Sequence, residues 1–340
     1  MKKKTYLLTG VAGFIGSNLA EELLRQGHRI IGIDNLNPSY WPKKKQHNLE
    51  SIQKSLAPKS DSFVFHHVDI CDMKNLSKLF QSEHFDGVIA LAALAGVQPS
   101  LVNPQSYAEV NVNGTLNLLE CARQHHVKNF AFASSSSVYG GNQKIPFKES
   151  DAVNLPISPY AATKRAGELL GYTYHHLYAM NIACLRFFTV YGPKQRPDLA
   201  IYKFTRAMLR GELITLYGDG SSQRDYTYIT DIVMGIGQTL QWLEAPSAAQ
   251  AKYDIFNLGE NQMTKLNDLV KILEANFKTK AKVQYQPYLP GDVPITCADI
   301  THSQQVLGYK PQVKIEEGLR KFCEWFVREE KDKNWDPRKN

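Results

Sequence analysis

Hydrophobic and polar positions alternate in blocks along the first half of the chain. Tyr6–Thr9 is a short apolar run, Ser17–Gln26 is an amphipathic stretch, and His28–Ile33 is a second apolar run. Apolar runs of this length predict buried strands, and apolar residues at three- and four-residue spacing predict helices. Because the alternation continues from residue 5 to about 186, we predict an α/β protein with a doubly wound parallel sheet.

The pattern changes after Tyr191, where the pairs Gly192-Pro193 and Arg196-Pro197 interrupt it. Tyr228–Glu244 then has the strand-and-helix pattern of the first half again. The second half therefore predicts a smaller lobe that is discontinuous in sequence. The predicted domains are a sheet domain of residues 1–188 plus about 225–261, and a C-terminal α/β lobe of about 189–224 plus 262–340.

Three glycines connect the first predicted strand to the first predicted helix, at Gly10, Gly13 and Gly16. Glycines at this spacing let the backbone and a helix N-terminus approach a pyrophosphate. Asp34 ends the second predicted strand, where a carboxylate accepts hydrogen bonds from a ribose diol and disfavours a 2′-phosphate. The unit therefore predicts NAD rather than NADP. A glycine-rich turn in an unrelated α/β protein is the alternative, which the complete strand, helix, strand and acid disfavour.

Tyr160 and Lys164 lie four residues apart in SPYAATKRAGELL, a segment that predicts a helix opened by Pro159. This spacing brings both side chains onto one helix face. An ammonium group and a cationic cofactor ring would lower the phenol pKa from its usual value of about 10, giving a base near neutral pH. The spacing alone is common in helices. The serines Ser134–Ser137 strengthen the catalytic interpretation of Tyr160 and Lys164. These serines follow the apolar run Phe130–Ala133, at the sheet edge that binds ligands.

These features together resemble the extended short-chain dehydrogenase/reductase family. The segments that carry the resemblance are TGVAGFIG, IDNLN, LAALAG, NVNGTLNLLE, SSSSVYG and SPYAATK, in the family's order. Three later segments, RFFTVYGPKQRPDLA, GDGSSQRDYTYITDIV and PGDVPITCAD, are similar to the nucleotide-sugar 4-epimerases, most closely to the UDP-glucuronate 4-epimerases. The resemblance covers nearly the whole chain. It implies an NAD-dependent isomerase with a Rossmann-like sheet domain and a nucleotide-sugar-binding lobe.

The resemblance also implies roles for individual residues. Ser135, Tyr160 and Lys164 would form a catalytic triad: Tyr160 takes the 4-hydroxyl proton, Ser135 hydrogen-bonds it, and Lys164 holds the nicotinamide ribose. The residues expected at the cofactor are Gly10, Gly13, Phe14, Ile15, Gly16, Asp34, Asn35, Asn37, Asp69, Ile70, Leu91, Ala92, Ala93, Asn111, Tyr160, Lys164 and Phe187. The residues expected at the UDP-sugar are Ser136, Ser137, Thr189, Arg196, Tyr217, Arg224 and Asp292.

The two residues after Ser135 bear on the type of reaction. Related dehydratases carry an Asp-Glu pair there and related decarboxylases carry a Glu, whereas this chain has Ser136 and Ser137. A hydroxyl group is a poor general acid or base at neutral pH. We therefore expect oxidation at C4, rotation of the 4-keto sugar and hydride return to the opposite face, which is epimerisation.

The expected substrate rests on fewer residues. By resemblance, Thr189, Ser136 and Ser137 would hold the C6 carboxylate of a uronic acid, which favours UDP-glucuronate and UDP-galacturonate over neutral sugars. A UDP-glucose or UDP-N-acetylglucosamine 4-epimerase is the alternative, and a non-enzymatic dinucleotide-binding sensor is a further one. One departure concerns Gln98, where the relatives usually have arginine, so one fewer cation is expected near the substrate.

Composition limits the remaining classes. The five scattered cysteines lack a C-x-x-C pair and predict reduced thiols in the cytoplasm, and the paired histidines lack companions for a metal site. The net charge of +7 is spread along the chain, which suits a polyanionic nucleotide-sugar better than nucleic acid. The longest apolar run, Val88–Val97, is too short to span a membrane.

Two predicted helices carry apolar residues on more than one face, around Asn103–His125 and Tyr160–His176. The residues concerned are Leu116, Leu118 and Leu119 in the first helix and Leu169, Leu170 and Tyr172 in the second. A single sheet face cannot cover both sets of side chains. As in the family, the helices are expected to pair across a two-fold axis as the four-helix bundle of a homodimer.

Overall fold

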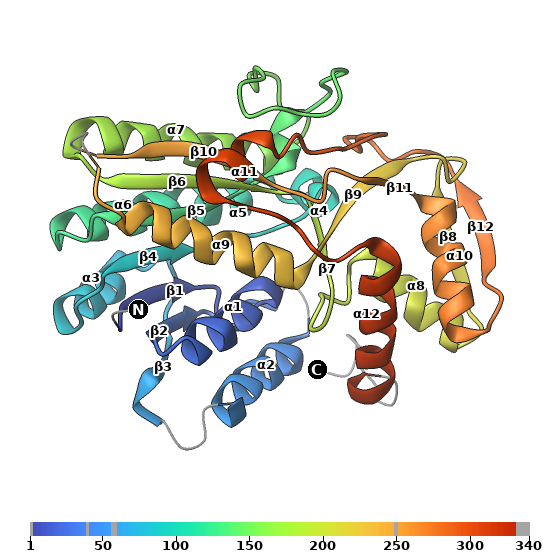
Figure 1. Ribbon diagram of the computed structural model, residues 1–340, viewed down its shortest axis with the longest axis horizontal. Helices are drawn as coiled ribbons and strands as arrows, with labels where there is room; N and C mark the ends of the chain where they lie inside the picture. Colours follow the sequence, from blue (N-terminus) through green and yellow to red (C-terminus); the bar gives the residue numbers. More distant parts are fainter. Residues whose placement is uncertain (1–2, 39–40, 56–59, 248–250, 331–340) are drawn as a thin grey trace.

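Seven strands form one sheet at the centre of the molecule, in the order β10-β6-β5-β4-β1-β2-β3 (Figure 1). The structure is a computed structural model that describes residues 3–38, 41–55, 60–247 and 251–330. All neighbouring strands of this sheet are parallel, as the alternating pattern predicts. The strands are β1 (Thr5–Thr9), β2 (Arg29–Asp34), β3 (Phe63–His67), β4 (Gly87–Ala90), β5 (Asn129–Ser135), β6 (Asn181–Phe187) and β10 (Tyr253–Leu258).

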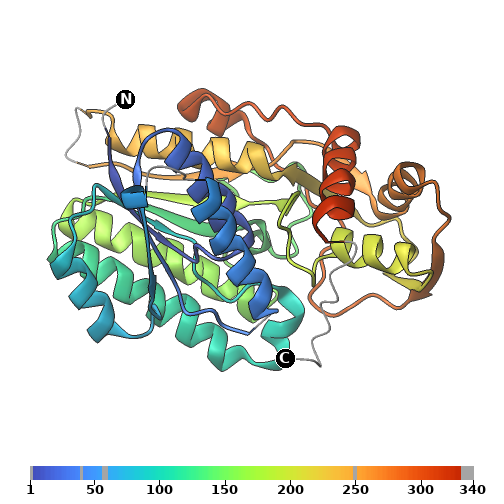
Figure 2. The same cartoon turned by 90° about the horizontal axis from the view of Figure 1, so that it is seen from below.

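Helices cover both faces of the sheet, so its strands are apolar on both sides (Figure 2). In β1, Leu7 packs into the core on one face and Leu8 into the core on the other. The helices over the Leu8 face are α1 (Phe14–Arg25), α2 (Pro42–Ser55) and α9 (Ile229–Glu244), and those over the Leu7 face are α3 (Met73–Ser82), α6 (Gly114–Gln124) and α7 (Pro159–Tyr178). The predicted α/β class with a doubly wound parallel sheet is confirmed.

Two small sheets lie beside the large one, on the right of Figure 1. Their strands are β7 (Thr189–Tyr191), β9 (Gln223–Tyr228) and β11 (Met263–Lys265) in one sheet, and β8 (Leu213–Tyr217) and β12 (Lys282–Gln286) in the other. The neighbouring helices are α8 (Ala200–Leu209), α10 (Leu266–Phe277) and α12 (Ile315–Glu329), while α11 (Thr301–Leu307) contacts α9 and β10. The division into two domains stays a prediction. Within it, residues 1–2, 39–40, 56–59, 248–250 and 331–340 lie outside the described residues.

Helix α7 lies unusually close to the sheet. A Cβ atom added at Gly167 would overlap the ring of Phe132 on β5, and one added at Gly171 would lie 3.2 Å from Ile182 on β6. The helix begins as predicted, with Pro159 in its first turn, and the Ser158 side chain accepts a hydrogen bond from Ala161 N at 3.1 Å. The first two turns of α7 are thereby held over the carboxyl end of β5.

Some predicted boundaries differ from the structure. Helix α1 begins at Phe14 rather than Ser17, because the third glycine already belongs to its first turn. The predicted helix at Asn103–His125 is three pieces, namely α5 (Pro104–Ala108), the π-helix η2 (Glu109–Asn113) and α6. In the apolar run Val88–Val97, only residues 88–90 belong to the strand β4, and the chain then leaves the sheet through residues 91–96 and enters α4 (Val97–Val102). The remaining short helices are η1 (Ser60–Ser62) and η3 (Ser136–Tyr139).

Candidate active site

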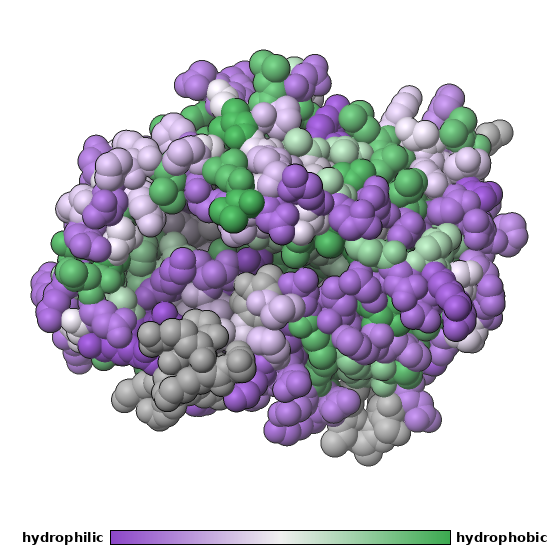
Figure 3. Space-filling view, turned by 180° about the vertical axis from the view of Figure 1, so that it is seen from behind, coloured by the Kyte–Doolittle hydropathy of each residue, from purple (hydrophilic) through white to green (hydrophobic). Residues whose placement is uncertain are grey.

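A cavity of about 340 Å³ lies at the carboxyl edge of the large sheet. The surface seen from behind is hollowed near its middle (Figure 3). All but one of the residues predicted to bind the dinucleotide line this cavity, and the exception is Asn111. Those that line it are Gly10, Gly13, Phe14, Ile15, Gly16, Asp34, Asn35, Asn37, Asp69, Ile70, Leu91, Ala92, Ala93, Tyr160, Lys164 and Phe187.

The N-terminus of α1 forms one wall of the cavity. Gly13 is its N-cap, and in this described segment no side chain caps the helix and no acidic residue stands in its first turn. Gly10 has a left-handed backbone (φ 70°), and a Cβ atom there would lie 2.9 Å from Ala92 N. Exposed amides and a positive helix end suit a phosphate anion, so this wall fits the pyrophosphate of a dinucleotide.

Asp34 lies buried at the end of β2, on the same side of the cavity. Its carboxylate accepts hydrogen bonds from Ala12 N at 3.2 Å and Leu36 N at 2.8 Å, and it lies 3.3 Å from Lys45 Nζ. Lys45 also lines the cavity but was not predicted to do so. Its only signal in the sequence was a run of three lysines, which is typical of a solvated surface.

Asn111 is buried behind the cavity wall rather than in it. Its side chain accepts from Leu94 N at 2.8 Å and donates to Leu94 O at 2.9 Å and to Thr163 Oγ1 at 3.1 Å. These bonds join the loop after β4 to helix α7. Asn111 lies within the π-helix η2, whose turn is wider than that of an α-helix.

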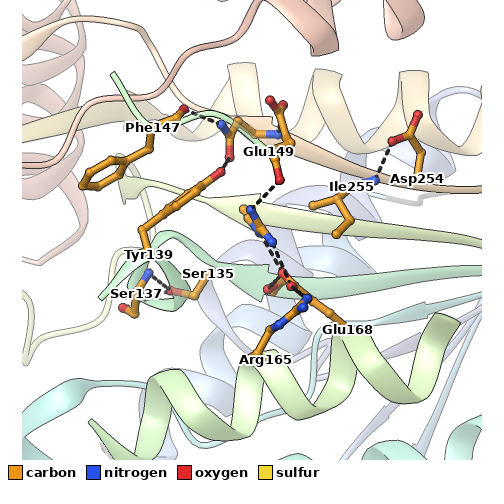
Figure 4. A network of polar contacts seen from close by, with 12 residues as sticks. Ser135, Ser137, Tyr139, Phe147, Glu149, Arg165, Glu168, Asp254 and Ile255 are labelled. Carbon is orange, nitrogen blue, oxygen red and sulfur yellow. Dashed lines mark hydrogen bonds and ion pairs between the residues drawn. The ribbon is translucent and has the colours of Figure 1, made fainter. Parts of the chain in front are cut away.

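The three predicted catalytic residues meet in the cavity, Ser135 at the end of β5 and Tyr160 and Lys164 on α7. Lys164 Nζ donates to Ala133 O at 2.7 Å. Ser135 Oγ accepts from Ser137 N at 3.2 Å (Figure 4). The triad therefore combines a hydroxyl, a phenol and an amine in one enclosed space.

Burial shifts the pKa values of two residues of the triad. Burial raises the pKa of Tyr160, while a hydrogen bond with Ser135 and the positive charge of Arg196 act in the opposite direction. Burial lowers the pKa of Lys164 to about 7. In the protein alone, desolvation therefore disfavours the charged forms of both groups, and the lowering of the phenol pKa by an ammonium together with a cationic cofactor ring stays a prediction.

The predicted sugar-binding residues divide into two groups. Thr189 and Arg196 line the cavity near the triad. Arg196 is held there by Asp198, with 2.6 Å between its guanidinium and the carboxylate. Ser136 and Ser137 begin η3 next to Ser135 and are partly exposed, although they are not among the residues that line the cavity.

The other three residues predicted to bind UDP, namely Arg224, Asp292 and Tyr217, lie outside the cavity lining. Arg224 on β9 and Asp292 form an ion pair with each other, at 2.7 Å. Tyr217 ends β8 and is substantially exposed. Gln98, the departure from the family pattern, donates to Pro290 O at 2.8 Å and so joins α4 to the loop that carries Asp292.

Other groups with metal or redox chemistry are sparse. Within residues 3–38, 41–55, 60–247 and 251–330, no three His, Cys, Asp or Glu side chains gather where they could hold a metal ion. All five cysteines are free thiols. Over the same described ranges, no helix is both long enough and apolar enough to cross a membrane.

A family model described as GDP-mannose 4,6 dehydratase matches residues 7–322. The chain belongs to this family. A relative in it, the UDP-glucuronate 4-epimerase of Thermodesulfobacterium geofontis, is 42% identical over 322 residues, which is 94% of this chain and 95% of that protein. The expected resemblance to the nucleotide-sugar epimerases of the short-chain dehydrogenase/reductase family is thereby confirmed.

Solved structures of family members are also similar. The UDP-glucuronic acid 4-epimerase of Bacillus cereus, in complex with UDP-glucuronic acid and NAD, superposes with a TM-score of 0.86 at 34% identity, covering 95% of this chain and 99% of that chain. The UDP-glucose 4-epimerase of Thermotoga maritima, with UDP-glucose, gives a TM-score of 0.84 at 32% identity, covering 95% and 99%.

The lowered pKa of Lys164 predicts a pH dependence of stability for the protein freed of bound small molecules. Between about pH 7 and the usual lysine value of 10.5, the unfolded chain holds a proton that the folded chain does not. The free energy of unfolding should therefore rise with pH in this window, by at most about 1.4 kcal/mol per pH unit. Urea unfolding of wild type and Lys164→Met from pH 7 to 10 measures this effect. The free energy of unfolding of wild type minus that of Lys164→Met should increase with pH. Parallel curves would contradict the assignment.

Proposed function

We propose that this protein is an NAD-dependent nucleotide-sugar 4-epimerase that interconverts UDP-glucuronate and UDP-galacturonate. The observation that carries the proposal is the meeting of Ser135, Tyr160 and Lys164 in one cavity with Asp34 and the open N-terminus of α1. The similarity to the Bacillus cereus and Thermodesulfobacterium geofontis enzymes supports the same activity. A UDP-glucose 4-epimerase is the second candidate, supported by the similarity to the Thermotoga maritima enzyme.

In this proposal the chain's own residues manage the proton and the sugar. Bound NAD supplies a hydride acceptor and donor for C4 of the sugar. Tyr160 takes the 4-hydroxyl proton, and Ser135 hydrogen-bonds the same oxygen. Lys164 anchors the nicotinamide ribose, and its ammonium favours the phenolate once the site is occupied. The positive charge of Arg196 already acts on Tyr160 in the same sense.

The absence of an acid–base pair after Ser135 supports epimerisation over elimination. Ser136 and Ser137 offer hydroxyls where a dehydratase needs carboxyl groups, so the 4-keto sugar has no partner for loss of water. It can turn in the site and be reduced on its other face. The family model that matches this chain is described as a dehydratase. In this chain Ser136 and Ser137 stand where dehydration needs an acid–base pair.

The remaining residues are assigned to the substrate. Thr189, with Ser136 and Ser137, is assigned to the C6 carboxylate, while Arg196 and Arg224 are assigned to the diphosphate. Asp292 is assigned to the uridine ribose and Tyr217 to the uracil. We place the cofactor on residues 1–188 plus about 225–261, and the nucleotide-sugar on the lobe formed by the rest. A cytoplasmic location is part of the same proposal, since both ligands are cytoplasmic metabolites.

Product analysis tests the activity directly. Purified protein incubated with UDP-glucuronate should convert it to UDP-galacturonate without net consumption of NAD, as resolved by chromatography or NMR. Tyr160→Phe should react about 10²- to 10⁴-fold more slowly, because the general base is removed while the fold is kept. If only UDP-glucose or UDP-N-acetylglucosamine is converted, the second candidate replaces the first. A Tyr160→Phe variant as fast as wild type would show that another group takes the proton.

The carboxylate assignment predicts a change in product. The 4-keto form of a uronic acid is a β-keto acid, and it loses CO₂ fastest when the bond to its carboxylate lies parallel to the carbonyl π system. Thr189→Ala removes one hydroxyl bond to a charged group, worth about 1.5–3 kcal/mol, so decarboxylation should gain about ten- to a hundredfold relative to epimerisation. Carbon dioxide release and product NMR measure the ratio, with Thr189→Ser as the control that keeps the hydroxyl. No added CO₂ would mean that other groups hold the carboxylate.

We also propose that the protein is a homodimer through α6 and α7, which lie side by side on one face of the sheet (Figure 1). Of the apolar residues named above on these helices, Leu118 and Leu119 are buried in the core. The outward apolar residues are instead Leu116, Leu169, Tyr172, Leu177 and Tyr178. A second copy of the same helices would cover them and complete a four-helix bundle.

A pair of leucine variants tests the dimer. Leu169 is 53% exposed on α7, whereas Leu155 is 84% exposed in a loop. Leu169→Glu should raise the dimer dissociation constant at least tenfold, since a charge would be buried at the interface. Leu155→Glu should leave it unchanged. Light scattering across a concentration series measures both, and a wild-type monomer at micromolar concentration would refute the proposal.

A further inference from the structure

A second buried carboxylate lies on the catalytic helix, outside the predicted site. Glu168 follows Lys164 by one helical turn and Tyr160 by two, so the three share one face of α7. Its side chain is completely buried. Glu168 and Arg165 extend from α7 toward the sheet in Figure 4. The proposed reaction gives Glu168 no proton to carry and no substrate atom to touch.

The carboxylate of Glu168 is fully occupied by hydrogen bonds. Ser134 Oγ donates to Oε1 at 2.6 Å, and Arg186 donates from Nε to Oε1 at 2.8 Å and from its second amine to Oε2 at 3.0 Å. Arg165 donates to Oε2 at 2.9 Å. Burial by itself would raise the pKa of Glu168, but the hydrogen bonds and charge of Arg186, with those from Ser134 and Arg165, lower it, so the group is ionised.

Two of the three donors to Glu168 belong to the strands beneath the active site, and the third, Arg165, lies on α7 itself. Ser134 on β5 and Arg186 on β6 are direct neighbours in the parallel register. Arg186 is 1% exposed, lies 4.8 Å from the ring centre of Tyr139, and reaches Glu149 O at 3.4 Å. The carboxylate therefore joins α7 to both strands and to the segment after Ser135.

Three consecutive residues at the end of β5 each meet a different turn of α7. Ala133 O accepts from Lys164 Nζ, Ser134 Oγ donates to Glu168, and Ser135 shares a hydrogen bond with Tyr160. Two of these three contacts belong to the triad itself. The Glu168 contact is the one that brings a bidentate arginine pair with it, which is the more rigid kind of ionic bond.

We propose that Glu168 is a positioning residue for the triad: its clamp on Ser134 and Arg186 fixes α7, and with it Tyr160 and Lys164, against Ser135. The inference rests on the proposed function, because the triad is the machinery that is positioned. A misplacement of about 1 Å between reacting groups can cost about a hundredfold in rate, whereas substrate and dinucleotide contacts elsewhere in the cavity are unaffected.

The loss of the carboxylate has a second effect, through charge. Without it, two guanidinium groups would face each other beneath the site without a counter-charge, and an unpaired buried charge is strongly unfavourable. The helix and β6 should then separate locally. Glu168→Gln keeps the shape and one oxygen acceptor but removes the charge, and Ser134→Ala removes only the hydroxyl donor. The two variants weaken the clamp to different degrees.

Steady-state kinetics on the NAD-bound enzyme with UDP-glucuronate provides the first readout. Glu168→Gln should lower kcat by about 30- to 100-fold and change KM less than about threefold, and Ser134→Ala should lower kcat by about three- to tenfold. The control is Asp231→Asn, which alters another buried carboxylate, 3% exposed, that accepts from Gln312 N and Val313 N at 3.0 Å. It should lower stability with kcat unchanged. A wild-type kcat in Glu168→Gln would overturn the proposal, as would an equal loss of kcat in Asp231→Asn.

Hydrogen–deuterium exchange gives a second readout that does not depend on the reaction. In Glu168→Gln, amides of residues 158–168 should exchange at least tenfold faster than in wild type, while Asp231→Asn should leave them protected. Unchanged protection in Glu168→Gln refutes the clamp whatever the substrate is. If wild type converts no UDP-sugar but the exchange result holds, the proposed function fails and the clamp stands.

Discussion

The approach of α7 to the central sheet is the contact on which the candidate site depends. Gly167 lies directly against Phe132 on β5, leaving no room for a larger residue. Because of this short separation, Lys164 reaches the backbone of Ala133 and Glu168 reaches Ser134 without long or strained side chains. The phenol, the amine and the serine hydroxyl then converge on the same edge of the sheet. Strands β1 and β2 end beside the start of α1, and there they form the wall of the cavity that fits the pyrophosphate of a dinucleotide.

Much of the fold was predictable from sequence because its signals are local. Apolar runs of strand length, an amphipathic helix and glycines at fixed spacing all act within a few residues of one another, and the seven-stranded parallel sheet follows from their alternation. The place of the site at the carboxyl edge of the sheet follows from the parallel strands, whereas the individual cofactor residues were expected from the resemblance to the family. Sixteen of the seventeen residues predicted at the cofactor line the cavity, and Asn111 is the exception.

The features that the sequence did not predict depend on long-range contacts or on burial. The π-helix at Glu109–Asn113 is set by the bonds of Asn111 to Leu94 and Thr163, which are distant in sequence. Lys45 gave no signal, since a lysine that meets Asp34 looks like any other in a basic run. The raised pKa of Tyr160 and the lowered pKa of Lys164 in the protein alone were not predicted, because neighbouring charges can be read from spacing, whereas desolvation requires the packed structure.

If Arg224 binds the diphosphate and Asp292 the uridine ribose, as we propose, the ion pair between these two residues has a consequence for which ligands bind there. Each group neutralises the other, so a ligand that separates them must replace both partners. An inorganic anion offers a new partner to the arginine alone and leaves the carboxylate unmatched. A molecule that carries a phosphate and a vicinal diol at the right separation offers one to each. In the proposed assignment, the pair therefore favours a ligand that carries both groups, such as a whole nucleotide, over a simple anion.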